Sequence, residues 1–379
     1  MRRGYKIRIY PNDEQAAALS NQFGAARWIY NFCLEWRSSA WKDNKQSISK
    51  NKLITKIAEL KKSPETEWLK TADSQALQQS VINLDRGFQN FFSRRGKYPR
   101  FKSSRSRQSI TYPQRVKINR VDELIYLPKI GWVKALLHRP FEEGDVIKQV
   151  IVSRTETGKY FASLSLDNPK EAPVKADDLC ESEVLGVDLG ITDVIATSGG
   201  NKVPNPRFLK RAAKNLRRKQ QSLSRKSKGS ANRAKARLAV AKAHERLANV
   251  RRDFQHKLSR QIVDENQAVV CETLKVKNMM KNRRLAKSIS DASWFSFVLK
   301  LEYKLEWAGK RLVKLDQWFP GSKTCSNCQI IVNKMPLDMR HWDCPSCGAS
   351  HDRDINAALN HKVKGIEFLK AEGLFVSAC

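Results

Sequence analysis

Four cysteines near the end of the chain have the spacing of a metal site. Two Cys-x2-Cys pairs, CSNC and CPSC, are separated by fifteen residues. Two such pairs on tight turns present four thiolates to one tetrahedral Zn²⁺, and four thiolates leave no open position for water. The sequence therefore predicts a structural zinc ribbon with the ligands Cys325, Cys328, Cys344 and Cys347. His341 and His351 flank the cysteines, and we expect both to lie outside the coordination shell.

Three acidic residues stand at the ends of predicted elements. Asp188 lies in the apolar strand VLGVDLG, Glu272 closes AVVCE, and Asp354 opens the last predicted helix. A carboxylate in an apolar strand is costly unless it is paired or binds a metal. For any one of these acids alone, a satisfied structural role remains an alternative. Converging carboxylates are the ligands that Mg²⁺ prefers, and two such ions can act on a phosphodiester, with Asp188 the expected bridging ligand.

The charge of the chain indicates a polyanionic partner. Its 379 residues include 71 Lys and Arg against 38 Asp and Glu, which gives a net charge of +33. A solvated basic surface is the alternative, but neutralisation of phosphates explains so large an excess better. Apolar runs such as Val184–Val187 end long before the ~18 residues of a membrane span. We therefore expect no membrane association and a location in the bacterial or archaeal cytoplasm, near the nucleoid, with scattered cysteines such as Cys180 as free thiols.

The first half of the chain predicts a small β-barrel interrupted by a helical module. Residues 5–10 alternate as a strand, and Asn12 with Gln15 forms a capping box that opens a helix. Apolar stripes then predict helices across residues 13–95. Strands and turns are then predicted over about residues 109–170, including a hairpin across residues 146–166. The stretch GKYPRFKSSRSRQS is either a solvated linker or a phosphate-contacting loop, with candidate contacts at Lys97, Arg100 and Lys102.

The second half alternates buried strands with helices. Strand patterns at VLGVD, AVVCE and residues 311–317 surround a strongly basic helical region over 206–265, which Gly229 is expected to break in two. An amphipathic helix is predicted over 293–310, the ribbon over 321–350 and a last helix over 354–370. A solvated helix pair is the alternative for the basic region, but clustered cations with few acids favour a phosphate backbone. The candidate contacts there are Arg217, Arg218, Lys219, Arg251 and Arg252.

Motifs spread over nearly the whole chain resemble the TnpB (OrfB) proteins of insertion sequences, relatives of the type V CRISPR effectors. The series runs through YKIRIYP, FGAARWIYN, QALQQSVINLDRGFQNFF, KYPRFK, GVDLGI, VVCETL, LEYKLEWAGKR, KTCSNC and CPSCGASHDRDINAALN. DRDINAA behind a cysteine pair is the most specific of these, and it favours Asp354 over its neighbour Asp352 as the third acid. Gln329 stands where the family usually has Gly, and Gly321 where it usually has Ser.

The resemblance implies a multidomain α+β fold. An RNase H-like (RuvC) α/β nuclease domain would occupy residues 181–320 and 351–379, with the basic helical insertion at 206–265 and the zinc ribbon at 321–350. A wedge-like β-barrel would take residues 1–12 and 96–180, and a helical recognition insert would take residues 13–95.

The resemblance also implies an RNA-guided DNA endonuclease of a transposable element. Its partners would be a guide RNA from the transposon end and double- and single-stranded target DNA. Asp188, Glu272 and Asp354 match the catalytic triad that would hold two Mg²⁺ ions, and the four cysteines match the zinc ligands. In the helix that reads the target-adjacent motif, Gln75 and Gln79 are the candidates for adenine readout. A monomer is favoured.

Two other functions compete with this hypothesis. A nuclease-inactive RNA-guided repressor would be marked by loss of a triad acid or of the ribbon, yet every one of these residues is present. A DNA strand-transfer transposase of the tyrosine type would need a His-x-His pair, which the six histidines do not form. A carboxylate-type strand transferase stays open, because it uses the same kind of acids and metals.

Overall fold

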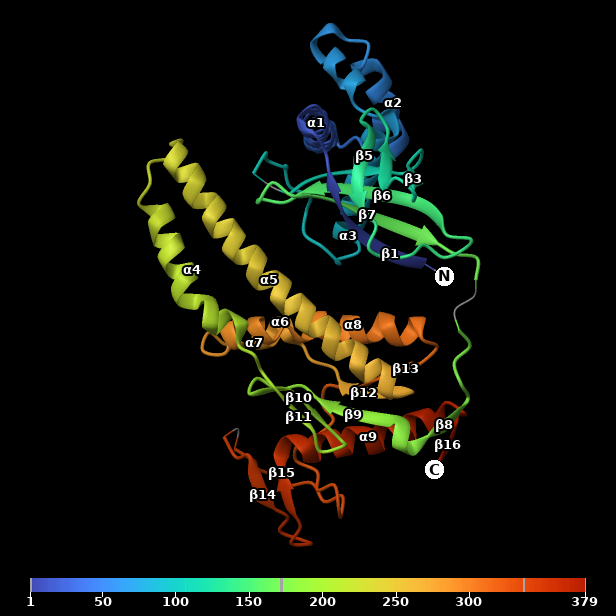
Figure 1. The fold of residues 1–379 in the computed structure, drawn as a ribbon, viewed down its shortest axis with the longest axis vertical. Helices are drawn as coiled ribbons and strands as arrows, with labels where there is room; N and C mark the ends of the chain where they lie inside the picture. The colour runs from blue at the N-terminus through green and yellow to red at the C-terminus, as the bar shows by residue number, and fades with distance from the viewer. Residues whose placement is uncertain (1, 106, 171–172, 337, 379) are drawn as a thin grey trace. The chain divides into compact units, whose positions relative to one another are not determined.

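The computed structural model describes residues 2–105, 107–170, 173–336 and 338–378. The chain divides into two compact units, Met1–Glu171 and Ala172–Cys379 (Figure 1). Each unit has its own apolar core. None of the helices in the described residues combines the length and the apolar composition that a membrane crossing requires.

The first unit is built on an antiparallel seven-stranded sheet. Its order is β2-β6-β7-β1-β5-β4-β3, so the first strand of the chain lies between strands from residues after 130. The alternation that predicts β1 buries Tyr5, Ile7 and Ile9 against this sheet's core. The strands are β1 (Arg2–Tyr10), β2 (Gln108–Tyr112), β3 (Lys117–Asn119), β4 (Leu124–Leu127), β5 (Gly131–Leu136), β6 (Val146–Arg154) and β7 (Tyr160–Asp167). Among the described residues no pairing joins β2 to β3, so closure into a barrel stays a prediction.

Helices occupy the segment between β1 and β2. They are α1 (Asp13–Asn44), α2 (Lys50–Leu60), the 3₁₀ helix η1 (Pro64–Thr71) and α3 (Ser74–Phe92). The predicted capping box is confirmed, because Asn12 and Gln15 exchange side-chain and backbone hydrogen bonds of 2.8 and 3.1 Å. Asp73 caps α3 in the same way through the backbone N–H of Ala76. Apolar side chains from α1, α2 and α3 form a separate core with η1.

The second unit contains a mixed five-stranded sheet in the order β11-β10-β9-β12-β13. Strands β9, β10 and β11 are antiparallel neighbours, whereas β12 runs parallel to both β9 and β13. These strands are β9 (Val184–Asp188), β10 (Asp193–Thr197), β11 (Lys202–Pro204), β12 (Ala268–Glu272) and β13 (Arg311–Leu315). Two short two-stranded sheets pair β8 (Asp178–Cys180) with β16 (Phe375–Ser377) and β14 (His341–Asp343) with β15 (Ser350–Asp352).

The helices of this unit include the three predicted helical segments, and two short helices between residues 276 and 292 that were not predicted. They are α4 (Phe208–Ser224), α5 (Ala231–Glu265), α6 (Val276–Met279), α7 (Ala286–Ala292), α8 (Trp294–Trp307) and α9 (Arg353–Ala371), with a 3₁₀ turn η2 (Glu181–Glu183) before β9. The predicted break in the basic region is real, because Gly229 has a φ of +88° between α4 and α5. The two helices pack side by side (Figure 1).

Two glycines let α9 lie directly on the sheet. A Cβ at Gly186 of β9 would overlap the carbonyl oxygen of Ala358 and lie 2.7 Å from the backbone nitrogen of Lys362. A Cβ at Gly365 of α9 would overlap the side chain of Val270 of β12. Helix and sheet therefore approach more closely than residues with side chains would allow, which fixes the first turn of α9 beside the ends of β9 and β12.

One expectation about the cysteines is wrong. Cys33 and Cys271 are free and buried, as predicted, but Cys180 is disulfide-bonded. Spacing along the chain does not reveal which distant thiols meet in the fold, so a scattered cysteine can be read as free when it is paired.

Candidate functional site

The three predicted acids come from elements that meet at one edge of the five-stranded sheet. Asp188 is the last residue of β9 and Glu272 the last residue of β12. These strands are parallel neighbours, and the residues before the acids, Val187 and Cys271, are partners in the pairing register. Asp354 lies in the first turn of α9, which packs on both strands. The fold thus brings together acids that are 84 and 82 residues apart in sequence.

Asp188 has the electrostatics of a carboxyl held among other carboxyls. Burial, with Glu272 and Asp354 acting in the same direction, raises the pKa of Asp188 to about 8, against the opposing charges of Arg353 and Lys202. Burial also raises the pKa of Glu272 to about 7. An acid that is shielded from water and faces two further acids favours its neutral form unless a cation enters.

Asp354 and its neighbour Asp352 have different roles in the fold. Asp352 is the N-cap of α9, and its carboxylate accepts from the backbone N–H groups of Asp354 and Ile355 at 3.0 and 3.1 Å. Burial acts against ionisation of Asp352, but a 2.7 Å hydrogen bond from Lys202 and the N–H of Ile355 lower its pKa overall. Lys202 also lies 3.5 Å from Asp354, whose other oxygen is 3.3 Å from Arg340.

The donor set suits a hard divalent ion. Three carboxyls and no sulfur or imidazole ligand are what Mg²⁺ binds. Across residues 2–105, 107–170, 173–336 and 338–378, only the four cysteines form a group of three or more ligand side chains within 4.8 Å of one another. The acids are therefore spaced more widely. Such spacing would suit two ions better than one, because the ligands of two ions need not all reach a single cation.

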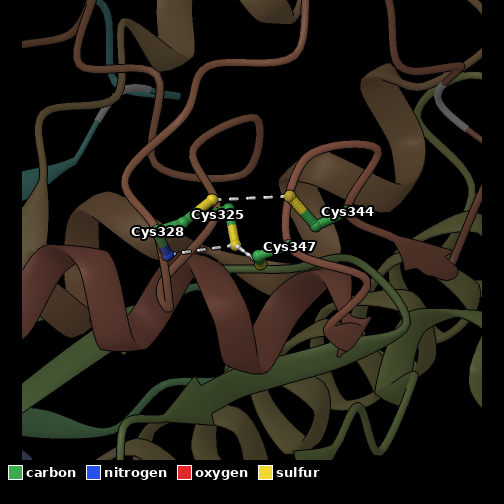
Figure 2. Close-up of side chains that lie close together, drawn as sticks. All are labelled: Cys325, Cys328, Cys344 and Cys347. Atoms are coloured by element: carbon green, nitrogen blue, oxygen red, sulfur yellow. Dashed lines mark hydrogen bonds between the residues drawn. The ribbon is translucent and has the colours of Figure 1, made fainter.

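The four cysteines form a cluster whose sulfur atoms all lie within 4.8 Å of one another (Figure 2). Cys325 Sγ is 3.7 Å from Cys347 Sγ, and Cys328 Sγ is 3.6 Å from Cys344 Sγ. Zn–S bonds of about 2.3 Å in a tetrahedron put sulfurs about 3.8 Å apart, so these two separations are those expected of a zinc site. His351, through its Nε2, lies 3.1 Å from Cys325 Sγ.

Amide side chains of α9 bind the base of the ribbon. Asn356 donates to the carbonyl of Thr324 at 2.7 Å, and Asn360 donates to the carbonyls of Thr324 and Gly321 at 2.6 and 2.8 Å. A Cβ at Gly321 would lie 2.7 Å from Nε2 of His361, which explains why this chain has glycine there. Gln329, by contrast, has a φ of +61°, a left-handed conformation that favours glycine.

Sequence patterns gave no signal for Lys202 and Arg340. Neither residue belongs to a recognisable motif, and each reaches Asp354 only because β11 and the ribbon fold over the end of α9. Only knowledge of the strand order would have placed them beside the carboxyls.

The predicted nucleic-acid contacts are scattered over both units. Gln75 and Gln79 lie on α3, where they donate to Gln114 and Asn83 at 3.1 and 3.2 Å. Lys97 and Arg100 are exposed, whereas the ammonium of Lys102 lies 3.8 Å from the ring centroid of Tyr30. On α4 and α5, the predicted contacts are the exposed Arg217, Arg218 and Arg252, the half-buried Lys219, and Arg251, which pairs with Asp291 at 2.9 Å.

Comparison with known proteins places these sites in a family. Residues 168–283 match the OrfB_IS605 family, described as "Probable transposase". Residues 294–361 match the Cas12f1-like TNB domain, and residues 1–46 a helix-turn-helix domain. A Streptomyces pristinaespiralis protein named "Putative RNA-guided DNA endonuclease" is 42% identical over 381 residues, spanning 100% of this chain and 91% of that protein. The chain belongs to the OrfB (TnpB) family.

More distant relatives agree with this placement. Escherichia coli K12 has a protein named "Putative RNA-guided DNA endonuclease InsQ", which is 29% identical over 94% of this chain and 90% of its own length. The solved Cas12f1-sgRNA-target DNA complex contains a chain of similar fold, with a TM-score of 0.56 and 17% identity, covering 93% of this chain and 83% of that one. This likeness supports a type V effector-like fold for the OrfB chain.

Proposed function

We propose that this OrfB protein is an RNA-guided DNA endonuclease that hydrolyses phosphodiester bonds with Mg²⁺ held by Asp188, Glu272 and Asp354. The observation that carries the proposal is the placement of the three acids at the ends of β9 and β12 and in the first turn of α9, and the raised pKa of Asp188 supports it. Such a cluster is costly without cations, and the relative with 42% identity spans the whole chain. The strand order of the five-stranded sheet, and the position of Asp188 at the end of β9, support an RNase H-like (RuvC) domain.

Each acid has a defined role in this proposal. Asp188, which faces both other carboxyls, would bridge two ions, while Glu272 and Asp354 would each hold one. Bound Mg²⁺ would supply the charge that keeps these carboxyls ionised and stabilises the reacting phosphate. Lys202 and Arg340 flank Asp354 and keep its carboxylate oriented, and their positive charge also attracts the DNA backbone.

The remaining assignments follow from charge and from the family. A guide RNA from the transposon end and target DNA would neutralise the net charge of +33. The predicted contacts on the loop after α3 and on α4 and α5 would bind phosphates, and Gln75 and Gln79 would read bases. We also propose a wedge-like barrel with a helical insert in the first unit, structural zinc in the ribbon, a cytoplasmic location and a monomeric state.

Copurified RNA offers the direct test. The RNA bound to the full chain is sequenced, its variable end is reprogrammed, and the complex is incubated with Mg²⁺ and a plasmid library whose target has randomised flanks. We expect cleavage at programmed targets beside one short motif, with 5′-phosphate ends. Asp188→Ala is the control, and it should bind the same RNA without cutting. Cleavage that ignores the reprogrammed sequence, or that survives in Asp188→Ala, would overturn the proposal.

A further inference from the structure

A basic cavity lies between α5 and α8, away from the carboxyl cluster. It has a volume of about 510 Å³ and is lined by Arg251, Arg252, Gln255, Ser293, Ser296 and Lys300, among others. No acidic residue belongs to its described lining. Apolar side chains of Ala248 and Leu299 also line the cavity, and the cationic and hydroxyl groups among its walls can bind an oxyanion.

Lys300 is the unusual residue of this cavity. Its side chain is buried, with 9% of its surface exposed. Its ammonium donates to Gln255 Oε1 at 3.0 Å, to Ser296 Oγ at 2.8 Å and to the carbonyl of Ser296 at 3.1 Å, all neutral acceptors. Within the described residues no carboxylate lies within ion-pair distance of Lys300. A buried cation without a counter-charge raises the free energy of the folded chain, and a bound anion would lower it again.

Further donors surround Lys300. Burial and the nearby charge of Arg252 both lower the pKa of Lys300, so two cations repel each other across the cavity. Arg251 uses one terminal nitrogen to bind Asp291, while its Nε is buried without a hydrogen-bond partner in the described structure. Ser293 is the N-cap residue immediately before α8, and its hydroxyl makes no capping bond. The start of a helix adds a partial positive charge at the same place.

We propose that this cavity binds a phosphate group of the guide RNA backbone, with Lys300, Arg252 and Ser293 as its ligands. The guide RNA part rests on the proposed function, whereas the anion site stands on the cavity itself. Phosphate is the favoured oxyanion because it accepts several hydrogen bonds at once, and because α5 carries the basic side chains that follow a phosphate chain. Lys300 would then fix one nucleotide of the RNA relative to α8.

The anion site is tested first with inorganic phosphate alone. Thermal unfolding of the RNA-free full chain is measured with and without millimolar phosphate at constant ionic strength. Saturation of the site should raise the melting temperature of the wild type by about 2–4 °C. Lys300→Met should lose this shift, while Lys242→Met, which removes an exposed charge from the same α5, should keep it. Equal shifts in wild type and Lys300→Met would overturn the site.

The same variants separate a ligand role from a structural one. Without phosphate, Lys300→Met loses three hydrogen bonds but also removes an uncompensated buried charge, so its melting temperature should stay within about 4 °C of the wild-type value. A larger drop would mean that Lys300 serves the packing of α5 on α8, against the proposal. Arg252→Gln provides a second variant, at an exposed position on the cavity wall where the substitution disturbs no core. It should reduce the rise in melting temperature caused by phosphate to half of the wild-type value or less.

A titration with RNA tests whether the phosphate in the cavity belongs to RNA or to a small compound. A fluorescein-labelled single-stranded RNA of about 30 nucleotides, long enough to span several phosphate contacts, is titrated at 0.1 M salt. Lys300→Met should weaken binding about 5–10-fold, and Lys242→Met no more than about twofold. If Lys300→Met loses the phosphate shift but binds RNA as the wild type does, the cavity takes a small phosphate compound and the guide RNA assignment is overturned. Neither readout depends on cleavage, so an inactive nuclease would leave both unchanged.

Discussion

Asn356 accepts a hydrogen bond from the backbone N–H of Ser326 at 2.9 Å. Ser326 lies inside the first cysteine pair, and Asn356 is two residues after Asp354 on α9. The same asparagine donates to the carbonyl of Thr324. The four-cysteine cluster is therefore attached, through one amide side chain, to the helix turn that carries the third acid of the carboxyl cluster.

This attachment predicts that loss of zinc impairs cleavage as well as the ribbon. Cys344→Ser should release zinc and unfold the ribbon, because bound metal supplies most of the folding free energy of such small sites. Since Asp354 then loses its support, we expect cleavage to fall at least about tenfold while RNA binding persists. Zinc content by mass spectrometry of the intact protein and a plasmid assay measure the two effects. Ser350→Ala, which changes the ribbon outside the ligands, should retain both.

The close packing of α9 predicts a strong effect of one methyl group. Gly186→Ala should push α9 away from β9, because the added Cβ meets the backbone of Ala358 and Lys362 rather than a flexible side chain. Overpacking against backbone should cost about 3 kcal/mol of unfolding free energy and displace Asp354 from Asp188. Gly199→Ala is the matched control in the same unit, since its Cβ would have no heavy atom closer than 3.9 Å. Equal denaturation midpoints for the two variants would contradict close packing as the cause.

Local patterns predicted well what depends on neighbouring residues. The capping box at Asn12, the break at Gly229 and the clustering of the four cysteines follow from chemistry within a few residues, and each is present in the fold. We inferred from their positions at strand ends that Asp188 and Glu272 lie close together. In the fold, β9 and β12 are parallel neighbours, and parallel strands place their carboxyl ends at one edge of the sheet.

What depends on distant contacts could not be predicted. Lys202 and Arg340 reach Asp354 from other elements, and Lys300 becomes a buried cation only when α5 packs on α8. The disulfide at Cys180 was missed for the same reason. The motif DRDINAA had already favoured Asp354 over Asp352 as the third acid, whereas the role of Asp352 as the N-cap of α9 is visible only in the fold.

That difference predicts contrasting variants of the two neighbours. Asp352→Asn keeps an N-cap acceptor and should retain cleavage, because Asn caps a helix about as well as Asp. Asp352→Ala should cost about 1 kcal/mol of unfolding free energy. Asp354→Asn should lose cleavage with little change in stability, since an amide is a poor ligand for Mg²⁺. Cleavage rates at saturating Mg²⁺ compare them. An inactive Asp352→Asn together with an active Asp354→Asn would exchange the roles of the two acids.

The raised pKa of Asp188 predicts how the metal-free protein responds to pH. Between an unfolded value of about 3.9 and the folded value of about 8, the native state holds a proton that the unfolded state has lost. In EDTA, the stabilising contribution of Asp188 to the free energy of unfolding should therefore be fully present below about pH 4. It should fall as the pH rises toward 8, by up to about 1.4 kcal/mol per pH unit. Asp188→Asn should flatten this decline. Urea unfolding at several pH values measures it, and parallel curves for the two proteins would contradict the assignment.

The left-handed backbone at Gln329 predicts a stabilising substitution. This conformation lowers the stability of the folded chain by about 1 kcal/mol for a residue with a Cβ, but not for glycine. Gln329→Gly should therefore strengthen the first cysteine turn, where the N–H of Gln329 donates to the carbonyl of Cys325 at 2.9 Å. We expect zinc to leave this variant about fivefold more slowly in excess chelator. Gln329→Ala is the control, because it removes the same side chain but keeps the Cβ, and it should release zinc at the wild-type rate or faster. If both variants slowed release equally, the side chain rather than the backbone conformation would be responsible.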